Sequence, residues 1–344
     1  MPPKIIAVIG ALDADFIMVT SRIFDCGESV CANHYHEALG GKGANSAIAT
    51  YRTCQKSHSA GETLPGDSLI VAAEQVTVGT GDDIQVEVIG AVGDDRYVPN
   101  SSPSISFVMI EGHTRENRCL FTPGARATWR KAYFVNAKQL GGGTQPDMVV
   151  SQMGIGKDVI ETVLATDGKA GIDFCINAAP ANPISKSLYR CLTDLLVNEC
   201  EAAITSGIDR DDVNTKTRLT IADEFLSLGV SNVVITLVEN STFYANVEGN
   251  GHCPAFNVKV EDTTGAGGTL TGTYASDYKR KEDDGGWDIG NAVVRANKAA
   301  AIKGQSLGAQ EIIPWSEDNG SFDAPLKGLD FQWSKAPRGP GGGA

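Results

Sequence analysis

Apolar positions along the chain follow two patterns, one typical of buried strands and one typical of amphipathic helices. Residues 4–9 and 233–237 are short runs rich in valine and isoleucine. The apolar positions of 44–51 and 270–278 recur instead three or four residues apart, as they do on one face of a helix. Strands that alternate with helical segments predict βαβ units and a mainly parallel sheet, so we expect an α/β fold.

A glycine-rich segment, 262–268, comes directly before the second of these helical patterns and reads Asp-Thr-Thr-Gly-Ala-Gly-Gly. The small residues Gly265, Ala266 and Gly267 would form the start of the helix, where backbone N–H groups are unpaired and the helix dipole is positive. An anion such as a phosphate group can approach these N–H groups closely. The same residues suit a turn that only caps a helix equally well, so other segments must decide.

A second glycine-rich segment, Gly-Gly-Lys-Gly-Ala-Asn, occupies residues 40–45. Gly40 and Gly41 would let the backbone come close to a polyol, while Lys42 and Asn45 offer hydrogen-bond donors. Alone, such a segment is more typical of a solvated loop. Together with 262–268 later in the chain it becomes a stronger signal, because two motifs in a fixed order are hard to obtain by chance.

In this order the two segments resemble the two signatures of the PfkB family of carbohydrate kinases, in their ribokinase form. The resemblance implies a ribokinase-like three-layer αβα sandwich with a mainly parallel central sheet and a small β-sheet lid. It also implies ATP, Mg²⁺ and K⁺ as cofactors and a sugar-like small molecule as substrate. The main domain would comprise residues 1–10, 39–102 and 126–335, and the discontinuous lid 11–38 and 103–125. Since the lid sheet of this family often pairs with a second subunit, a homodimer through the lid is one option.

The resemblance assigns roles to individual residues, including a lid-region turn at 123–125. The anion hole would be Gly265, Ala266 and Gly267, and the substrate would be held by Asp13, Asp15, Gly40, Gly41, Lys42 and Asn45. The nucleotide would lie at Asn198, Glu201, Thr236 and Asn297, with Glu201 reaching Mg²⁺ through water and with Asp262 and Thr264 binding the monovalent cation. Without the family, Asn198 and Glu201 are more typical of the start of a surface helix.

Several positions depart from the family pattern. The second signature normally ends in the aspartate that acts as general base, and Gly268 stands in its place. Gly154 replaces a glutamate that helps to hold the sugar, Val238 replaces a glycine near the phosphates, and Asp13 replaces an asparagine. An engineered change at Gly268 would not account for the others.

Three functions are consistent with these departures. The first is an ATP-dependent sugar kinase of impaired or altered activity, because loss of a general base typically costs about 10²- to 10⁴-fold in rate. The second is an inactive pseudokinase that serves as a binding or regulatory module. The third is an enzyme that uses the same cleft for different chemistry, since one fold hosts many functions.

Composition narrows the range of function classes. A formal net charge of −13 argues against a general nucleic-acid binder or a membrane-surface protein, which would show basic patches. No apolar run approaches the roughly 18 residues of a membrane span, and the N-terminus leads into a strand without a signal peptide. The eight cysteines have no zinc-type spacing, which favours a reduced, cytoplasmic protein. We expect a surface insertion at 53–83 and a disordered tail at 336–344, which is rich in proline and glycine.

Overall fold

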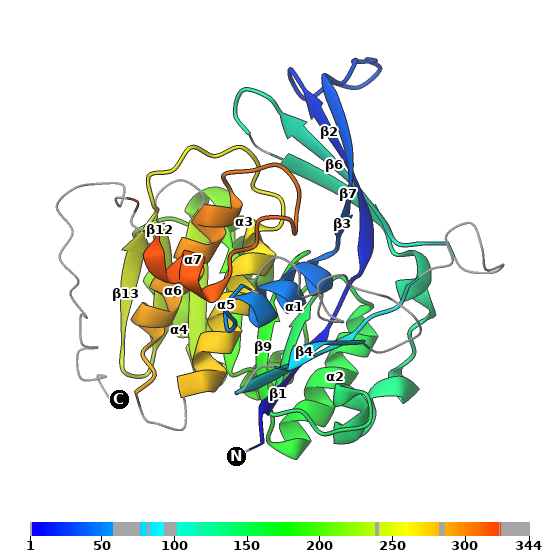
Figure 1. Ribbon diagram of the computed structural model, residues 1–344. Coiled ribbons are helices and arrows are strands. Elements are labelled where there is room, and N and C mark those ends of the chain that lie inside the picture. Colours follow the sequence, from blue (N-terminus) through cyan, green and yellow to red (C-terminus); the bar gives the residue numbers. More distant parts are fainter. Residues whose placement is uncertain are drawn as a thin grey trace.

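The computed structural model describes residues 2–57, 76–80, 83–92, 102–115, 117–237, 241–281, 286–322 and 324. Val238, most of the expected insertion at 53–83 and the expected tail at 336–344 lie outside the described residues. The described strands form two separate sheets. One is large and lies between layers of helices, and the other is small and projects from it (Figure 1).

The large sheet has nine strands in the order β13-β12-β11-β10-β9-β8-β1-β5-β4. Five neighbouring pairs, from β11 to β5, are parallel, and the pairs at the two edges are antiparallel. The expectation of a mainly parallel central sheet is therefore confirmed. The strands are β1 (Lys4–Ile9), β4 (Val76–Thr80), β5 (Ile84–Ile89), β8 (Met148–Gln152), β9 (Asp173–Asn177), β10 (Asp194–Asn198), β11 (Asn232–Leu237), β12 (Ser241–Asn246) and β13 (Gly249–Pro254).

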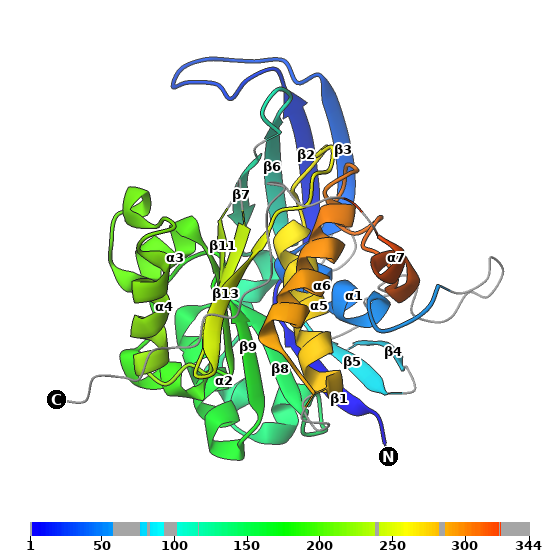
Figure 2. The ribbon, with the colours of Figure 1, turned by 90° about the vertical axis from the view of Figure 1, so that its left-hand side faces the viewer.

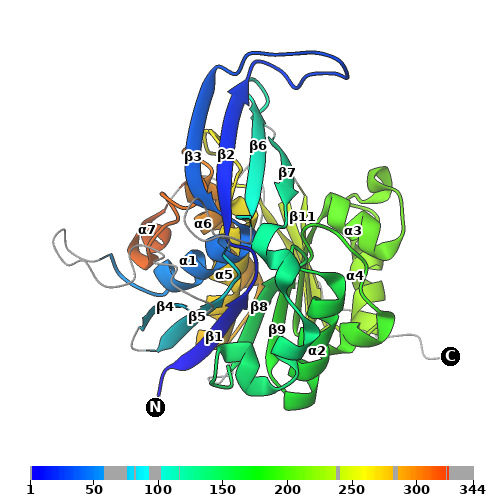
Figure 3. The same ribbon diagram turned by 90° about the vertical axis from the view of Figure 1, so that its right-hand side faces the viewer.

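Helices cover both faces of this sheet, which gives three layers (Figures 2 and 3). One face carries α1 (Lys42–Arg52), α5 (Ala266–Lys281) and α6 (Ile289–Lys303), and the other carries α2 (Lys157–Ala170), α3 (Glu199–Ser206) and α4 (Arg218–Ser227). A short helix, α7 (Ser316–Ser321), follows α6. The 3-10 helices are η1 (Gly124–Thr128), η2 (Lys131–Phe134), η3 (Ala137–Gly141), η4 (Lys186–Cys191) and η5 (Arg210–Asp212).

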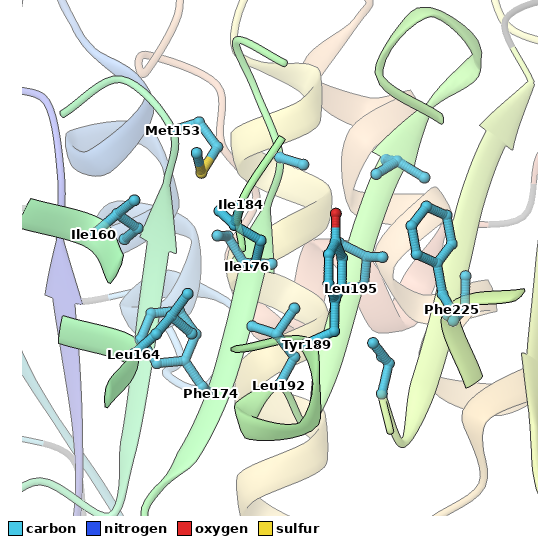
Figure 4. Packing of buried hydrophobic residues seen from close by; sticks show 14 of the residues in the cluster. Met153, Ile160, Leu164, Phe174, Ile176, Ile184, Tyr189, Leu192, Leu195 and Phe225 are labelled. Atoms are coloured by element: carbon cyan, nitrogen blue, oxygen red, sulfur yellow. The ribbon is translucent and has the colours of Figure 1, made fainter. Parts of the chain in front are cut away.

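Two hydrophobic cores fill the space between the layers. Successive residues of a strand point to opposite faces, so Val149 belongs to the core beneath α2 whereas Val150 belongs to the core beneath α1 and α5. Figure 4 shows the first of these cores, in which Phe174 and Leu195 from the sheet pack with Leu164 and Phe225 from the helices. Burial on both faces explains why the strands read as continuous apolar runs rather than as alternating ones.

The small sheet contains four strands in the order β3-β2-β6-β7. They are β2 (Asp13–Thr20), β3 (His34–Gly40), β6 (Ile105–Glu111) and β7 (Asn117–Thr122), and they rise from one end of the large sheet (Figure 1). Ile17, Val19, Val108 and Ile110 form a separate buried cluster on it. The strands come from two distant parts of the chain, and β3 extends to Gly40, where α1 follows almost at once. Among the described residues, no helix is long and apolar enough to span a membrane.

Candidate active site

A cavity of about 290 Å³ lies where the small sheet meets the ends of the parallel strands. Its lining combines residues that are far apart in the sequence, as expected for an open α/β sheet, in which ligands bind at the carboxyl ends of the strands. Of the residues predicted from the sequence, it is lined by Asp13, Asp15, Gly41, Lys42, Asn45, Asn198, Glu201, Thr236, Thr264, Gly265, Gly267 and Gly268. Gly40, Asp262, Ala266 and Asn297 do not line it.

The amino end of α5 borders this cavity. Gly265 has a φ of +81°, and a Cβ atom there would lie 2.5 Å from the carbonyl oxygen of Ala309, so both the backbone and the neighbour require glycine. No backbone acceptor for the N–H groups of Gly267 and Gly268 is present in the described part of the chain. The first turn of α5 therefore offers unpaired donors to an anion in the cavity.

Gly268 packs directly against α1. A Cβ atom at this position would lie 2.8 Å from the Cβ of Asn45 and 3.4 Å from the backbone nitrogen of Ser46. One turn later, a Cβ atom on Gly272 would lie 2.2 Å from the carbonyl oxygen of Ser46. A side chain at position 268 would therefore require Asn45 or the two helices to shift. The position expected to carry the general base is thus occupied by a glycine whose Cβ-side space is taken by Asn45.

Asp15 lines the cavity and is only 4% exposed. Burial and the neighbouring Asp13 carboxylate raise its pKa to about 7, against the opposing effects of a hydrogen bond with Ser106 and the positive charge of Lys42. A Cβ atom on Gly40 would lie 1.9 Å from Oδ2 of Asp15. Gly40 therefore serves the site indirectly, by leaving room for this carboxylate.

Arg126 is a site residue that the sequence interpretation missed. Its side chain is 3% exposed, its Nη2 forms an ion pair with Oδ1 of Asp13 at 3.1 Å, and its Nη1 donates to the carbonyl oxygen of Gly154 at 2.9 Å. A Cβ atom on Gly154 would lie 3.0 Å from Nη1, so the guanidinium occupies the space that a side chain at 154 would need. The turn at 123–125 was recognised from the sequence, but the arginine that follows it was not.

Asp13 and Gly154, two positions expected to depart from the family pattern, are both contacted by Arg126. Burial raises the pKa of Asp13, while the positive charges of Arg126 and Lys42 lower it. Burial also lowers the pKa of Arg126. A buried charge is tolerated when it is paired, and here each group supplies the partner of the other. An arginine–aspartate pair thus lies where the family resemblance predicts a glutamate.

Asn198 and Glu201 form the amino-terminal cap of α3. Oδ1 of Asn198 accepts from the backbone N–H of Glu201, and Oε2 of Glu201 accepts from the backbone N–H of Asn198, both at 2.8 Å. This capping box satisfies two N–H groups of the helix start. Both residues also line the cavity, so a role as the start of a helix is compatible with the expected role near the nucleotide. Burial raises the pKa of Glu201, and the hydrogen bond from Asn198 opposes this shift.

Of the other two residues expected to bind the nucleotide, Thr236 lines the cavity and Asn297 does not. Thr236, in β11, lines the cavity, and the next residues after the strand are outside the described part. Asn297 lies on α6, where its Oδ1 accepts from Oγ1 of Thr242 at 2.9 Å. This hydrogen bond holds Asn297 against β12, and Asn297 does not line the cavity.

Asp262 and Thr264, the residues expected to bind a monovalent cation, lie in the loop before α5. The fully buried Asp262 carboxylate accepts from the backbone N–H of Thr264 at 2.7 Å and of Gly308 at 3.1 Å. Oγ1 of Thr264 accepts from Nδ2 of Asn117 at 3.1 Å. The side chain of Lys303 reaches the same place, with Nζ 3.3 Å from the carbonyl oxygen of Asp262.

Comparison with known proteins agrees with this fold. The profile of the pfkB family carbohydrate kinases matches residues 4–316. A ribokinase of Staphylococcus aureus is 27% identical over 317 residues, covering 91% of this chain and 97% of its own, and a ribokinase of Schizosaccharomyces pombe is 29% identical over 343 residues, covering 92% and 98%. The structure of Arabidopsis thaliana ribokinase complexed with ribose and ATP superposes with a TM-score of 0.69 at 20% identity and covers 94% of this chain and 100% of that one.

Proposed function

Because this chain belongs to the PfkB family of carbohydrate kinases, we propose that it transfers the γ-phosphoryl group of ATP to a hydroxyl group of a sugar-like small molecule. The observation that supports the proposal is that one cavity is lined by both groups of residues to which the family resemblance assigns acceptor and phosphate binding. Asp15, Lys42 and Asn45 supply the polyol side, and the amides of Gly267 and Gly268 supply the anion hole. The acceptor hydroxyl and the phosphoryl group would meet in one enclosed space.

The reaction would proceed without a dedicated base. Phosphoryl transfer passes through a loose transition state, in which positioning and electrostatic stabilisation supply most of the catalysis. The N–H groups at the start of α5 would stabilise the negative charge of the transferring group. The proton of the acceptor hydroxyl would leave late, to water or to a phosphoryl oxygen. We expect turnover slower by about 10²- to 10⁴-fold than in a kinase whose site was built around a general base.

Glu201 supports a place for hydrated Mg²⁺ at the nucleotide end. Its Oε2 is engaged in the capping box, which leaves Oε1 for a bound water molecule. Mg²⁺ usually keeps several waters and binds through one or two carboxylates together with substrate phosphates, so this donor set fits. When bound, the ion would neutralise charge on the transferring phosphates.

A pentose is the first acceptor to test, because the relatives named above are ribokinases. The exchange of a glutamate for the pair of Arg126 and Asp13 supports a changed acceptor range. The free state of all eight cysteines supports the expected cytoplasmic location, where thiols stay reduced.

The test combines titration calorimetry with ATP and Mg²⁺ and an assay of ADP release across pentoses, hexoses and nucleosides. We expect ATP binding and slow ADP release with at least one acceptor, and loss of both acceptor binding and release in Lys42→Ala. Lys138→Ala, an exposed lysine of η3, is the matched control and should behave as the wild type. Absence of ATP binding by the wild type would overturn the proposal.

The packing of Gly268 against Asn45 favours a second candidate, a binding module without catalysis, because a Cβ atom at position 268 would be crowded by Asn45. It predicts that ATP and a polyol bind while ADP release stays at the level of uncatalysed hydrolysis for every acceptor. The same two measurements therefore separate the candidates.

A further inference from the structure

The last residue of α6, Lys303, is among the largest fully buried side chains of the described part of the protein. Its Nζ donates to the carbonyl oxygen of Asp262 at 3.3 Å and to that of Ser306 at 3.4 Å. Burial lowers the pKa of Lys303, whereas the nearby carboxylates of Asp262 and Glu311 raise it. A buried ammonium group is costly unless its charge is compensated, so this position requires an explanation.

The surroundings of this Nζ are those of a cation site. Two backbone carbonyl oxygens point at it, and the buried Asp262 carboxylate supplies negative charge. Asp262 is one of the two residues expected to hold K⁺. A K⁺ ion bound by the carbonyl oxygen of Asp262 would lie beside the ammonium group, and two like charges repel strongly in a low-dielectric interior. The residues present therefore do not fit a potassium ion.

We propose that the ammonium group of Lys303 is a built-in monovalent cation, which takes the place of K⁺ beside the anion hole. An ammonium group carries the same charge as K⁺ and is likewise satisfied by oxygen ligands. Because it is tethered to α6, it is present at every salt concentration. This inference concerns the architecture of the site and holds whether or not the chain turns over a substrate.

The tethered charge joins two loops that shape the anion hole. The carbonyl oxygen of Gly304, the residue after Lys303, accepts from the backbone N–H groups of Glu261 and Asp262 at 2.8 and 3.2 Å. Gly265, after Asp262, packs closely against the carbonyl oxygen of Ala309, which follows Lys303 in the chain. Lys303 thus holds the segment before α5 against the segment after α6. Its role is to position the amides of the anion hole.

The test compares thermal unfolding in KCl, NaCl and choline chloride at equal ionic strength for the wild type, Lys303→Ala and Lys298→Ala. Lys298 lies on the same helix, is partly buried, and donates from Nζ to the carbonyl oxygen of Phe322, so it is a control for the loss of a lysine–carbonyl hydrogen bond. We expect a wild-type midpoint that is the same in all three salts. Lys303→Ala should lose about 5 °C or more in choline chloride and recover part of this loss in KCl specifically.

A wild-type midpoint that rises in KCl but not in NaCl or choline chloride would overturn the proposal, as would a Lys303→Ala midpoint equal to that of the wild type. If Lys303→Ala does not fold, crystals of the wild type soaked in RbCl test whether a monovalent cation binds beside Lys303. No anomalous peak beside the carbonyl oxygens of Asp262 and Ser306 is expected, and a peak there would show that an ion binds despite the lysine. The ATP affinity is also measured in each salt, so that a failure of this proposal can be distinguished from a failure of the proposed kinase activity.

Discussion

At the scale of single residues, Asp15 links the chemistry of the cavity to pH. Its folded-state pKa of about 7 lies above the ordinary value of 3.8, so the folded protein holds a proton here that the unfolded chain releases. The stabilising contribution is complete below the unfolded pKa and is lost as the pH rises toward 7. A polyol, in contrast, donates hydrogen bonds to the ionised carboxylate and should bind better when the proton has left.

We therefore expect the affinity for the acceptor sugar to rise by roughly tenfold between pH 6 and pH 8, with release of a proton on binding below pH 7. Calorimetry in buffers of different ionisation enthalpy measures both quantities. Asp15→Asn should bind weakly at every pH and show no proton release. A wild-type affinity that is flat across this range would contradict the assignment of Asp15 to the polyol.

Local sequence motifs led to the prediction of Asp15, Lys42 and the glycines of 265–267, because each of these residues lies within a short segment that resembles a family motif. Arg126 and Lys303 escaped detection for the opposite reason. Arg126 contacts Asp13 and Gly154, and Lys303 contacts Asp262, all distant in the sequence. A buried charge is recognised only when its partner is known, and the fold alone brings such partners together.

At the scale of elements, the contact between α1 and α5 determines what position 268 can hold. We expect Gly268→Asp to lower the free energy of unfolding by about 1–3 kcal/mol, because its Cβ atom would overlap with Asn45. Gly267→Ala is the matched control, since the nearest atom to its Cβ would be Nδ2 of Asn177 at 3.9 Å. Chemical denaturation measures both.

Gly268→Asp also tests whether a general base is the only group that the proposed kinase site lacks. ADP release by Gly268→Asp should not exceed that of the wild type, because the helices must move apart before the carboxylate can enter the cavity. A variant that is as stable as the wild type and turns over acceptor at least tenfold faster would show that the two helices adapt readily, and that only the side chain is missing.

The helix α2 contains an unused buried carboxyl group. Asp167 is fully buried, neither of its carboxylate oxygens has a hydrogen-bond partner in the described part of the chain, and burial together with Asp173 raises its pKa to about 8. Because the folded-state pKa is raised, stability declines as the pH rises from about 4 to 8. The group is tolerated at neutral pH because it remains protonated.

Asp167→Asn should accordingly unfold at the same denaturant concentration as the wild type at pH 5 and should be more stable by about 4 kcal/mol at pH 9. Asp158→Asn, at an exposed position of the same helix, should show no such gain with pH. An equal effect of Asp167→Asn at both pH values would mean that the carboxyl group is not ionised at pH 9.

At the scale of the whole molecule, the α/β class and the mainly parallel sheet follow from the sequence because strands buried on both faces read as apolar runs such as 233–237. The small sheet is harder to derive from periodicity, because β2 and β6 are neighbours in space but lie about ninety residues apart. Family resemblance indicated the two segments, whereas the register of Phe16 beside Phe107 is a property of the fold.

The outer side of this small sheet supports the prediction of a homodimer through the lid. The ring of Phe16 stacks between those of Tyr35 and Phe107, at centroid distances of 6.3 and 6.0 Å, and Leu120 lies opposite Phe107 in the register. Tyr35, Phe107 and Leu120 are 52%, 40% and 74% exposed. An apolar group of this kind on an exposed sheet is typical of an interaction surface, and a second copy presents the same surface.

We expect the wild type to elute as a dimer in size-exclusion chromatography with light scattering, and Leu120→Glu to elute as a monomer, because the charge would be buried without a partner. Ile204→Glu is the matched control, since Ile204 is 52% exposed on α3, away from the small sheet. It should remain dimeric. If Leu120→Glu and the wild type both elute as monomers at concentrations up to about 100 μM, this face does not pair with a second copy, since an interface of ordinary size gives micromolar affinity or better.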